Sequence, residues 1–161
     1  MSPQRWIGAA LALAVAAVLQ MTIAYSLSIG PARPDILLTT LICAGLMLGM
    51  TASSAAGVWA GILIATMVGV NFGSFLVSRA TVGLLTGYLA EQGLREEIAV
   101  PPLATLVATV LCEGIYYLMA PAHRGIWWAE RVALEAVYNA VLSVPITLLL
   151  RRMGLKAKPR H

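Results

Sequence analysis

Two ionisable residues, Arg79 and Glu113, lie inside long apolar runs of this sequence. A charged group within a membrane-spanning helix costs about 2.5–3.5 kcal/mol on insertion scales, so it is usually paired or lines a wet cavity. Both residues are expected roughly 9 Å inside the same side of the membrane, given the 1.5 Å rise per helical residue. Adjacent antiparallel helices would let them meet. We therefore predict an Arg79–Glu113 ion pair in the outer half of a helix bundle.

Three further polar residues are expected close to this pair. Asn139 reaches a similar depth in the last apolar run, Tyr116 follows Glu113 by about one helical turn, and Asn71 lies in the turn before the run that holds Arg79. Together these residues predict a small polar site that opens to the extracytoplasmic side. Such a site either fixes the helices to one another or binds a ligand or partner.

Residue patterns that would indicate catalysis or metal binding are missing from the sequence. It contains no HExxH motif, no phosphate-binding Gly-Lys-Ser/Thr loop and no pair of aspartates within one apolar run. Cys43 and Cys112 lie inside apolar runs without a CxxC spacing, which favours small apolar space-fillers. His123 and His161 lie outside the apolar runs. We expect neither an enzyme nor a bound metal or other cofactor.

The composition determines the class of protein that positions these residues. Of the 161 residues, 60% are hydrophobic and 11% are charged, and the mean hydropathy is +0.84. A soluble domain of this size cannot bury so much apolar surface, which excludes a soluble enzyme, a disordered chain and a coiled coil. The net charge of +4 does not indicate nucleic-acid binding, because five of the eleven basic residues lie in the last eleven positions, directly after an apolar run. We expect a single all-α membrane domain.

Apolar runs and the breaks between them predict a bundle of six membrane-spanning helices. The expected spans are residues 6–29, 35–50, 54–70, 75–91, 99–119 and 132–150, followed by a basic tail over 151–161. The second and third spans are short and form a tight hairpin. Counting Lys and Arg gives seven on the side of the termini and three on the other side. By the positive-inside rule both termini are cytoplasmic.

Small residues recur along several spans and predict close helix packing, since lipid provides no hydrophobic drive for helices to associate. The third span has such residues at every fourth position, namely Ser53, Gly57, Gly61, Ala65 and Gly69, and the first span has the Ala10 and Ala14 pair. These faces serve either internal packing or the docking of a partner's helix. Trp127 and Trp128 are expected at the membrane interface, where they would meet a periplasmic partner.

Several short motifs, taken in their order along the chain, resemble the rod shape-determining protein MreD family. Residues 30–38 resemble the "RPD-leucine-rich" start of the family's second span, and residues 71–80 with 87–90 resemble its "G-x-x-x-G-x-R-A … Y-L" fourth span. Glu113 lies where members often carry a glutamate, and residues 138–152 are similar to the family's "Y-N-A … P … R-R" ending. Members often have "L-D-x-x-S-G" before the fourth span, whereas residues 68–73 contain no aspartate.

The resemblance implies a non-enzymatic scaffold in the inner membrane of a bacterium, where it is surrounded by membrane lipids and acts in cell elongation. It would bind the single-span protein MreC and act with the MreB cytoskeleton and the glycosyltransferase–transpeptidase pair that builds sidewall peptidoglycan. The family is also similar in fold to the S components of energy-coupling-factor vitamin transporters. In that alternative function the polar site is a vitamin pocket, and Ala10 and Ala14 dock the coupling subunit. Short outer loops and few buried polar residues favour the scaffold.

Overall fold

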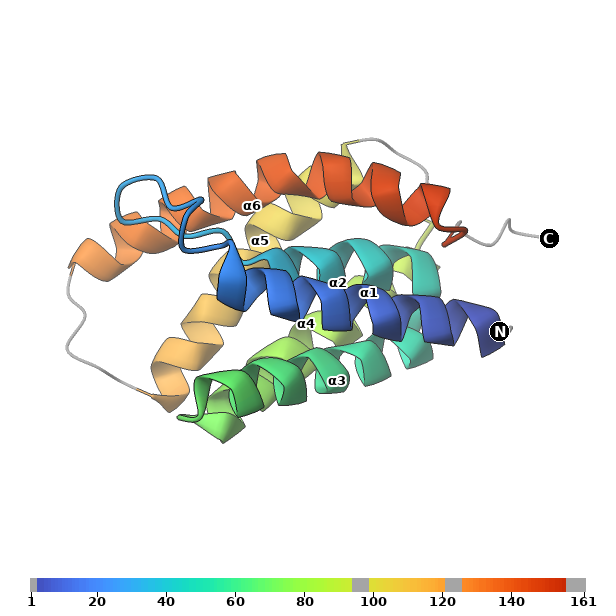
Figure 1. The fold of residues 1–161 in the computed structure, drawn as a ribbon, viewed down its shortest axis with the longest axis horizontal. Helices are drawn as coiled ribbons and strands as arrows, with labels where there is room; N and C mark the ends of the chain where they lie inside the picture. The colour runs from blue at the N-terminus through green and yellow to red at the C-terminus, as the bar shows by residue number, and fades with distance from the viewer. Residues whose placement is uncertain (1–2, 94–98, 121–125, 156–161) are drawn as a thin grey trace.

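The computed structural model describes residues 3–93, 99–120 and 126–155, and within these ranges all regular secondary structure is helical. The helices are α1 (Pro3–Thr22), α2 (Ile36–Leu48), α3 (Met50–Val68), α4 (Phe72–Glu91), α5 (Val100–Met119) and α6 (Ile126–Arg152). They form one bundle, in which α1 begins and α6 ends at the same end (Figure 1). The opposite end carries the loop between α1 and α2.

Four of these helices are long and apolar enough to cross a membrane. The candidate spans are Arg5–Thr22, Met50–Val68, Val100–Met119 and Trp127–Arg152, which indicate a multi-pass membrane protein. The 13 residues of α2 extend about 20 Å at 1.5 Å per residue, less than the roughly 30 Å of a bilayer's hydrocarbon core. Helix α4, which contains Arg79, is not among the four candidates.

The helix bounds differ from the expected spans mainly in the first and last helices. Helix α1 ends at Thr22 instead of residue 29, because the chain turns directly after it: the N–H groups of Ile23 and Ala24 both donate to the Leu19 carbonyl. Helix α6 begins at Ile126 instead of residue 132, so it includes Trp127, Trp128 and Arg131. The sequence predicts an interfacial position for Trp127 and Trp128 before the sixth span, and hydropathy alone does not show that the helix already begins there.

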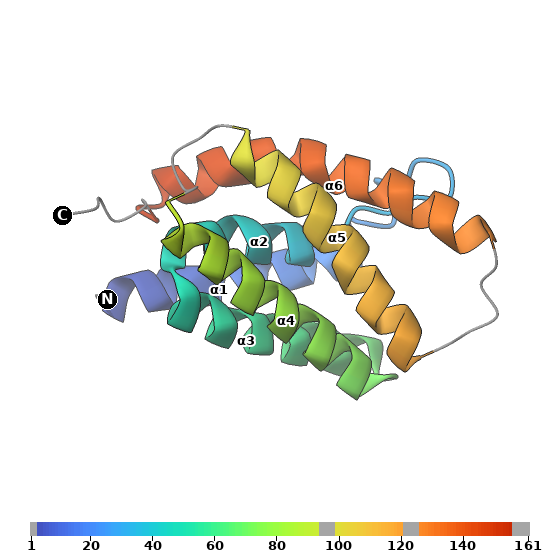
Figure 2. The same cartoon turned by 180° about the vertical axis from the view of Figure 1, so that it is seen from behind.

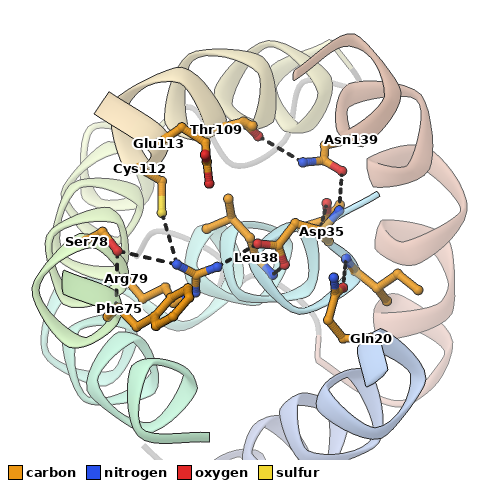
Figure 3. Close-up of polar contacts among 12 residues, drawn as sticks. Gln20, Asp35, Leu38, Phe75, Ser78, Arg79, Thr109, Cys112, Glu113 and Asn139 are labelled. Atoms are coloured by element: carbon orange, nitrogen blue, oxygen red, sulfur yellow. Dashed lines mark hydrogen bonds and ion pairs between the residues drawn. The ribbon is translucent and has the colours of Figure 1, made fainter. Parts of the chain in front are cut away.

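Helix α2 is the central element of the bundle and contacts every other helix. Figure 3 shows it enclosed by the surrounding helices, and all of its residues except Ile36 are buried. Asp35 caps its N-terminus by accepting a hydrogen bond from the Leu38 N–H. At the other end Gly49 has a φ of +87°, a backbone conformation that favours glycine and lets α3 begin at the next residue.

Helices α3 and α4 pack most closely, and their glycines make this possible. A Cβ atom built on Gly57 would lie 2.6 Å from the Arg79 carbonyl oxygen, and one on Gly61 would lie 2.8 Å from the Leu76 Cα atom. Ala65, further along the same stripe, is also buried. The stripe of small residues on α3 therefore packs against α4 within the bundle. The hypothesis that it receives a partner's helix is wrong, because that face is already occupied.

Two other faces of the bundle are apolar and accessible. On α1, Ala10 is exposed and Ala14 is half-buried, whereas Ala12 and Ala16 are buried in the core. Seen from behind, α5 runs obliquely past α4 (Figure 2). Between the C-terminal half of α4 and the N-terminal half of α5 lies an apolar groove of about 550 Å³.

Candidate functional site

A buried ion pair between Arg79 and Asp35 is the centre of the candidate site (Figure 3). The Arg79 Nη2 atom lies 2.7 Å from Asp35 Oδ2, and the two side chains are 3% and 9% exposed. The other carboxylate oxygen, Oδ1, accepts the hydrogen bond from the Leu38 N–H at 2.8 Å. One carboxylate therefore both caps α2 and neutralises the guanidinium from α4.

The expected direct Arg79–Glu113 pair is wrong. In the described part of the chain, the ion pairs within 4.0 Å join Arg79 to Asp35, and Arg131 to both Glu113 and Glu135. The sequence pattern places Asp35 at the first residue of the second span, at the outer boundary of the membrane. Because α2 starts inside the bundle, at the depth of Arg79, the carboxylate at its N-terminus reaches the guanidinium instead.

Further contacts fix the Arg79 side chain within α4 and α5. Its Nη1 atom donates to Ser78 Oγ at 3.4 Å and to Cys112 Sγ at 3.6 Å. The guanidinium carbon lies 5.0 Å from the centre of the Phe75 ring, a distance that allows a cation–π interaction. Polar and aromatic groups of the protein thus surround the charge.

Glu113 belongs to a second ion-pair cluster, between α5 and α6. Arg131 Nη2 lies 3.2 Å from Glu113 Oε2 and 3.5 Å from Glu135 Oε2. Both carboxylate side chains are buried, whereas the Arg131 side chain is 39% exposed. Sequence reasoning missed Arg131 and Glu135. Their spacing of four residues on a helix is a usable signal once α6 is extended to include residue 131.

Asn139 links α6 to the start of α2. Its Oδ1 atom accepts a hydrogen bond from the Asp35 backbone N–H at 2.8 Å, and its Nδ2 atom donates to Thr109 Oγ1 of α5 at 3.3 Å. From α1, Gln20 accepts from the Ile36 N–H at 2.6 Å. Helices α1 and α6 therefore hydrogen-bond directly to the start of α2, through Gln20 and Asn139. Helix α5 is connected to it through the bond between Thr109 and Asn139.

Asn71 and Tyr116 connect to the ion pair through an aromatic ring. Asn71 Nδ2 donates to Tyr116 Oη at 3.0 Å, and the Tyr116 ring centre lies 4.8 Å from that of Phe75. Asn71 itself precedes α4 with a left-handed backbone. Since the Phe75 ring also contacts the guanidinium, it joins these two residues to Arg79.

The two tryptophans at the start of α6 have different surroundings. Trp127 is 79% exposed, whereas the ring of Trp128 stacks on that of Tyr117 with 4.7 Å between their centres. Of the two, it is therefore Trp127 that presents most of its surface to the surroundings. His123 and His161 lie outside the described residues.

The network as a whole is suited to holding helices together. Arg79, Asp35 and Asn139 are all buried and bonded to one another or to neighbouring helices. Within the described residues, no group of three or more His, Cys, Asp and Glu side chains could hold a metal ion. Comparison of the chain with protein-family models, with curated proteins and with solved structures found no match.

Proposed function

We propose that this protein is a non-enzymatic scaffold in the bacterial inner membrane, with a role like that of the MreD family in cell elongation. It would bind an MreC-like single-span protein and support the glycosyltransferase–transpeptidase pair of sidewall peptidoglycan synthesis, directly or indirectly with MreB. The motif resemblance of the sequence suggests this role. The observation that carries the choice of a scaffold is that the side chains of Arg79, Glu113 and Asn139 each bond to other residues of the protein.

This observation weighs against the alternative, a vitamin-binding S component. A small-molecule site presents several convergent polar groups to its ligand. The three residues that would serve as vitamin ligands are each bonded within the chain: Arg79 to Asp35, Glu113 to Arg131, and Asn139 to both Asp35 and Thr109. Ligand binding would have to break some of these bonds, whereas a scaffold requires them for a fixed arrangement of helices.

The partner's helix is proposed to pack on α1. Since α4 covers the small-residue stripe of α3, the remaining stripe is the one at Ala10 and Ala14. Helix α1 contacts α2 and α3, and its outward side includes the exposed side chains of Leu11 and Val15. Two alanines one turn apart allow a second helix to approach closely, and the flanking aliphatic side chains can pack around it.

Affinity purification of the tagged chain from native membranes in mild detergent tests the proposed function. Recovery of an MreC-like protein together with a peptidoglycan synthase would support the elongation scaffold. Recovery of a coupling subunit with two ATPases would overturn it and make Arg79, Glu113 and Asn139 candidate vitamin ligands.

A matched pair of variants tests the docking face. We expect the Ala10→Leu, Ala14→Leu double variant to lose the MreC-like partner while the bundle stays folded, because the added side chains lie on an accessible face. The control is Ala133→Leu, which adds the same group at an exposed position of α6. Equal recovery of the partner with both variants would exclude α1 as the docking face.

A further inference from the structure

The loop between α1 and α2 presents apolar side chains to the surroundings at alternate positions. Ile23, Tyr25, Leu27 and Ile29 are all exposed, and Tyr25 and Ile29 are each 69% exposed. Full burial of one such side chain contributes about 1.5–3 kcal/mol, so a row of them in water would be unfavourable. The four side chains occur at every second residue over residues 23–29, and together they are called the apolar row.

The position of this loop corresponds to a membrane boundary. It follows the last residue of α1, which is a candidate span, and it lies at the end of the bundle where α3 and α5 also end (Figure 1). Tyr138 of α6 donates a hydrogen bond to the Leu27 carbonyl oxygen at 2.8 Å. The loop is therefore held beside α6, at the end of the bundle where α1 ends.

Several backbone groups of the loop are hydrogen-bonded within the chain, which lowers the cost of placing them where water is scarce. The N–H groups of Ile23 and Ala24 both donate to the Leu19 carbonyl, and that of Leu27 donates to the Ile23 carbonyl. At the tip, Ile29 and Ala32 exchange two hydrogen bonds, at 3.0 and 3.2 Å.

Two hydroxyl side chains of the segment also bond locally. Thr22 Oγ1 donates to the Val18 carbonyl at 2.8 Å, and Ser28 Oγ donates to the Tyr25 carbonyl at 2.7 Å. The guanidinium carbon of Arg33 lies 4.8 Å from the centre of the Tyr25 ring. Hydroxyl groups that bond the nearby backbone do not need water, and Arg33 provides a cation at the edge of the apolar row.

We propose that residues 23–29 form an interfacial lipid anchor. The side chains of Ile23, Tyr25, Leu27 and Ile29 lie in the boundary between lipid headgroups and acyl chains, with Arg33 directed towards the phosphate groups. Exposed Trp127, at the start of α6, belongs to the same end of the bundle and has the side-chain type that membrane interfaces favour. The anchor is independent of the proposed scaffold function.

Spin labelling in pure lipid vesicles tests the anchor. Cys43 and Cys112 are buried, so a label on an added cysteine reports from one site. Ile29→Cys and Tyr25→Cys are placed in the anchor, and Gln92→Cys, exposed after α4 at the opposite end, is the aqueous control. The protein is reconstituted into vesicles of phosphatidylethanolamine and phosphatidylglycerol, and collisions with oxygen and with a water-soluble nickel chelate are measured.

We expect both anchor labels to lose accessibility to nickel and gain accessibility to oxygen relative to the Gln92→Cys label. The use of two anchor positions keeps the test decisive if one variant does not fold. If both labels are as accessible to nickel as the control, the lipid anchor is refuted.

Discussion

Removal of Arg79 is the most informative perturbation of the buried network. In Arg79→Met a side chain of related length keeps most of the packing, but the Asp35 carboxylate stays buried without its cation. Breaking a buried pair by removing one partner costs about 3–5 kcal/mol. The Leu38 N–H still donates to the carboxylate, so we expect a loss near the lower limit, about 3 kcal/mol. This is a large part of the roughly 5–15 kcal/mol that stabilises a typical domain.

Substitutions of Asp35 separate its two roles. Asp35→Ala removes the ion pair and also the cap of α2, and the lost cap adds about 1 kcal/mol to the destabilisation. Asparagine is as good a cap as aspartate, so Asp35→Asn removes the charge and retains the hydrogen bond from the Leu38 N–H. The difference between the Asp35→Ala and Asp35→Asn variants thus measures the cap.

A double-mutant cycle measures the pair itself. We expect Asp35→Asn with Arg79→Met to destabilise the bundle by clearly less than the sum of the single changes, with a coupling towards the upper end of the roughly 0.5–3 kcal/mol seen for contacting groups. The matched cycle combines Arg79→Met with Glu113→Gln. It should show weaker coupling, because Glu113 is paired with Arg131.

The assay is reversible unfolding in mixed detergent micelles, with helix content followed by circular dichroism as the fraction of denaturing detergent rises. If the effects of Asp35→Asn and Arg79→Met on stability are additive, the ion pair between the two residues contributes no stability of its own. Stronger coupling in the Arg79–Glu113 cycle would show that the sequence-based pairing is right and that Asp35 is a secondary partner. Either result would refute the Arg79–Asp35 pair as the centre of the network.

Two further perturbations test the packing of α3 on α4 and the link between α6 and α2. Gly61→Leu should destabilise the bundle in the same assay, because even its Cβ atom would lie 2.8 Å from the Leu76 Cα atom. The control Ala55→Leu, on the exposed side of α3, should have little effect, and equal stability of the two variants would contradict the close α3–α4 contact. Asn139→Ala should cost about 1–3 kcal/mol, because it leaves the buried Asp35 N–H without its acceptor. The expected accompanying change is faster hydrogen exchange at that amide, and unchanged protection there would count against the link.

The sequence predicts the helical class and the interior of most helices, because hydropathy reports directly on burial in lipid. Residues 100–119, for example, match the expected span of 99–119 almost completely. Helix ends are less predictable. Residues 23–29 are apolar enough to extend α1, yet they form a loop with turn hydrogen bonds, and hydropathy alone does not distinguish an apolar loop from an apolar helix.

The spacing of the small-residue stripe on α3 could not predict whether the stripe packs inside the bundle or binds a partner's helix. A row at Gly57 and Gly61 fits an internal neighbour or a partner's helix equally well, since both need the same close approach. The distinction depends on a second row, on α4, where a Cβ atom on Gly83 would lie 2.5 Å from the Ser53 carbonyl oxygen. Two complementary glycine rows on helices joined by a short turn favour an internal contact over a docking face.

The error over the partner of Arg79 has a physical cause that applies to other membrane bundles. Arg79 lies about 10 Å along α4 from its first residue at 1.5 Å per residue, and only a group at that depth can pair with it. Carboxylates within other spans are one source. A helix too short to cross the bilayer provides another, because its N-terminus lies inside the bundle and favours a negatively charged cap. An aspartate directly before a short apolar run, as Asp35 is in this chain, should therefore be considered as the partner of a lone intramembrane arginine before any acid in a full-length span.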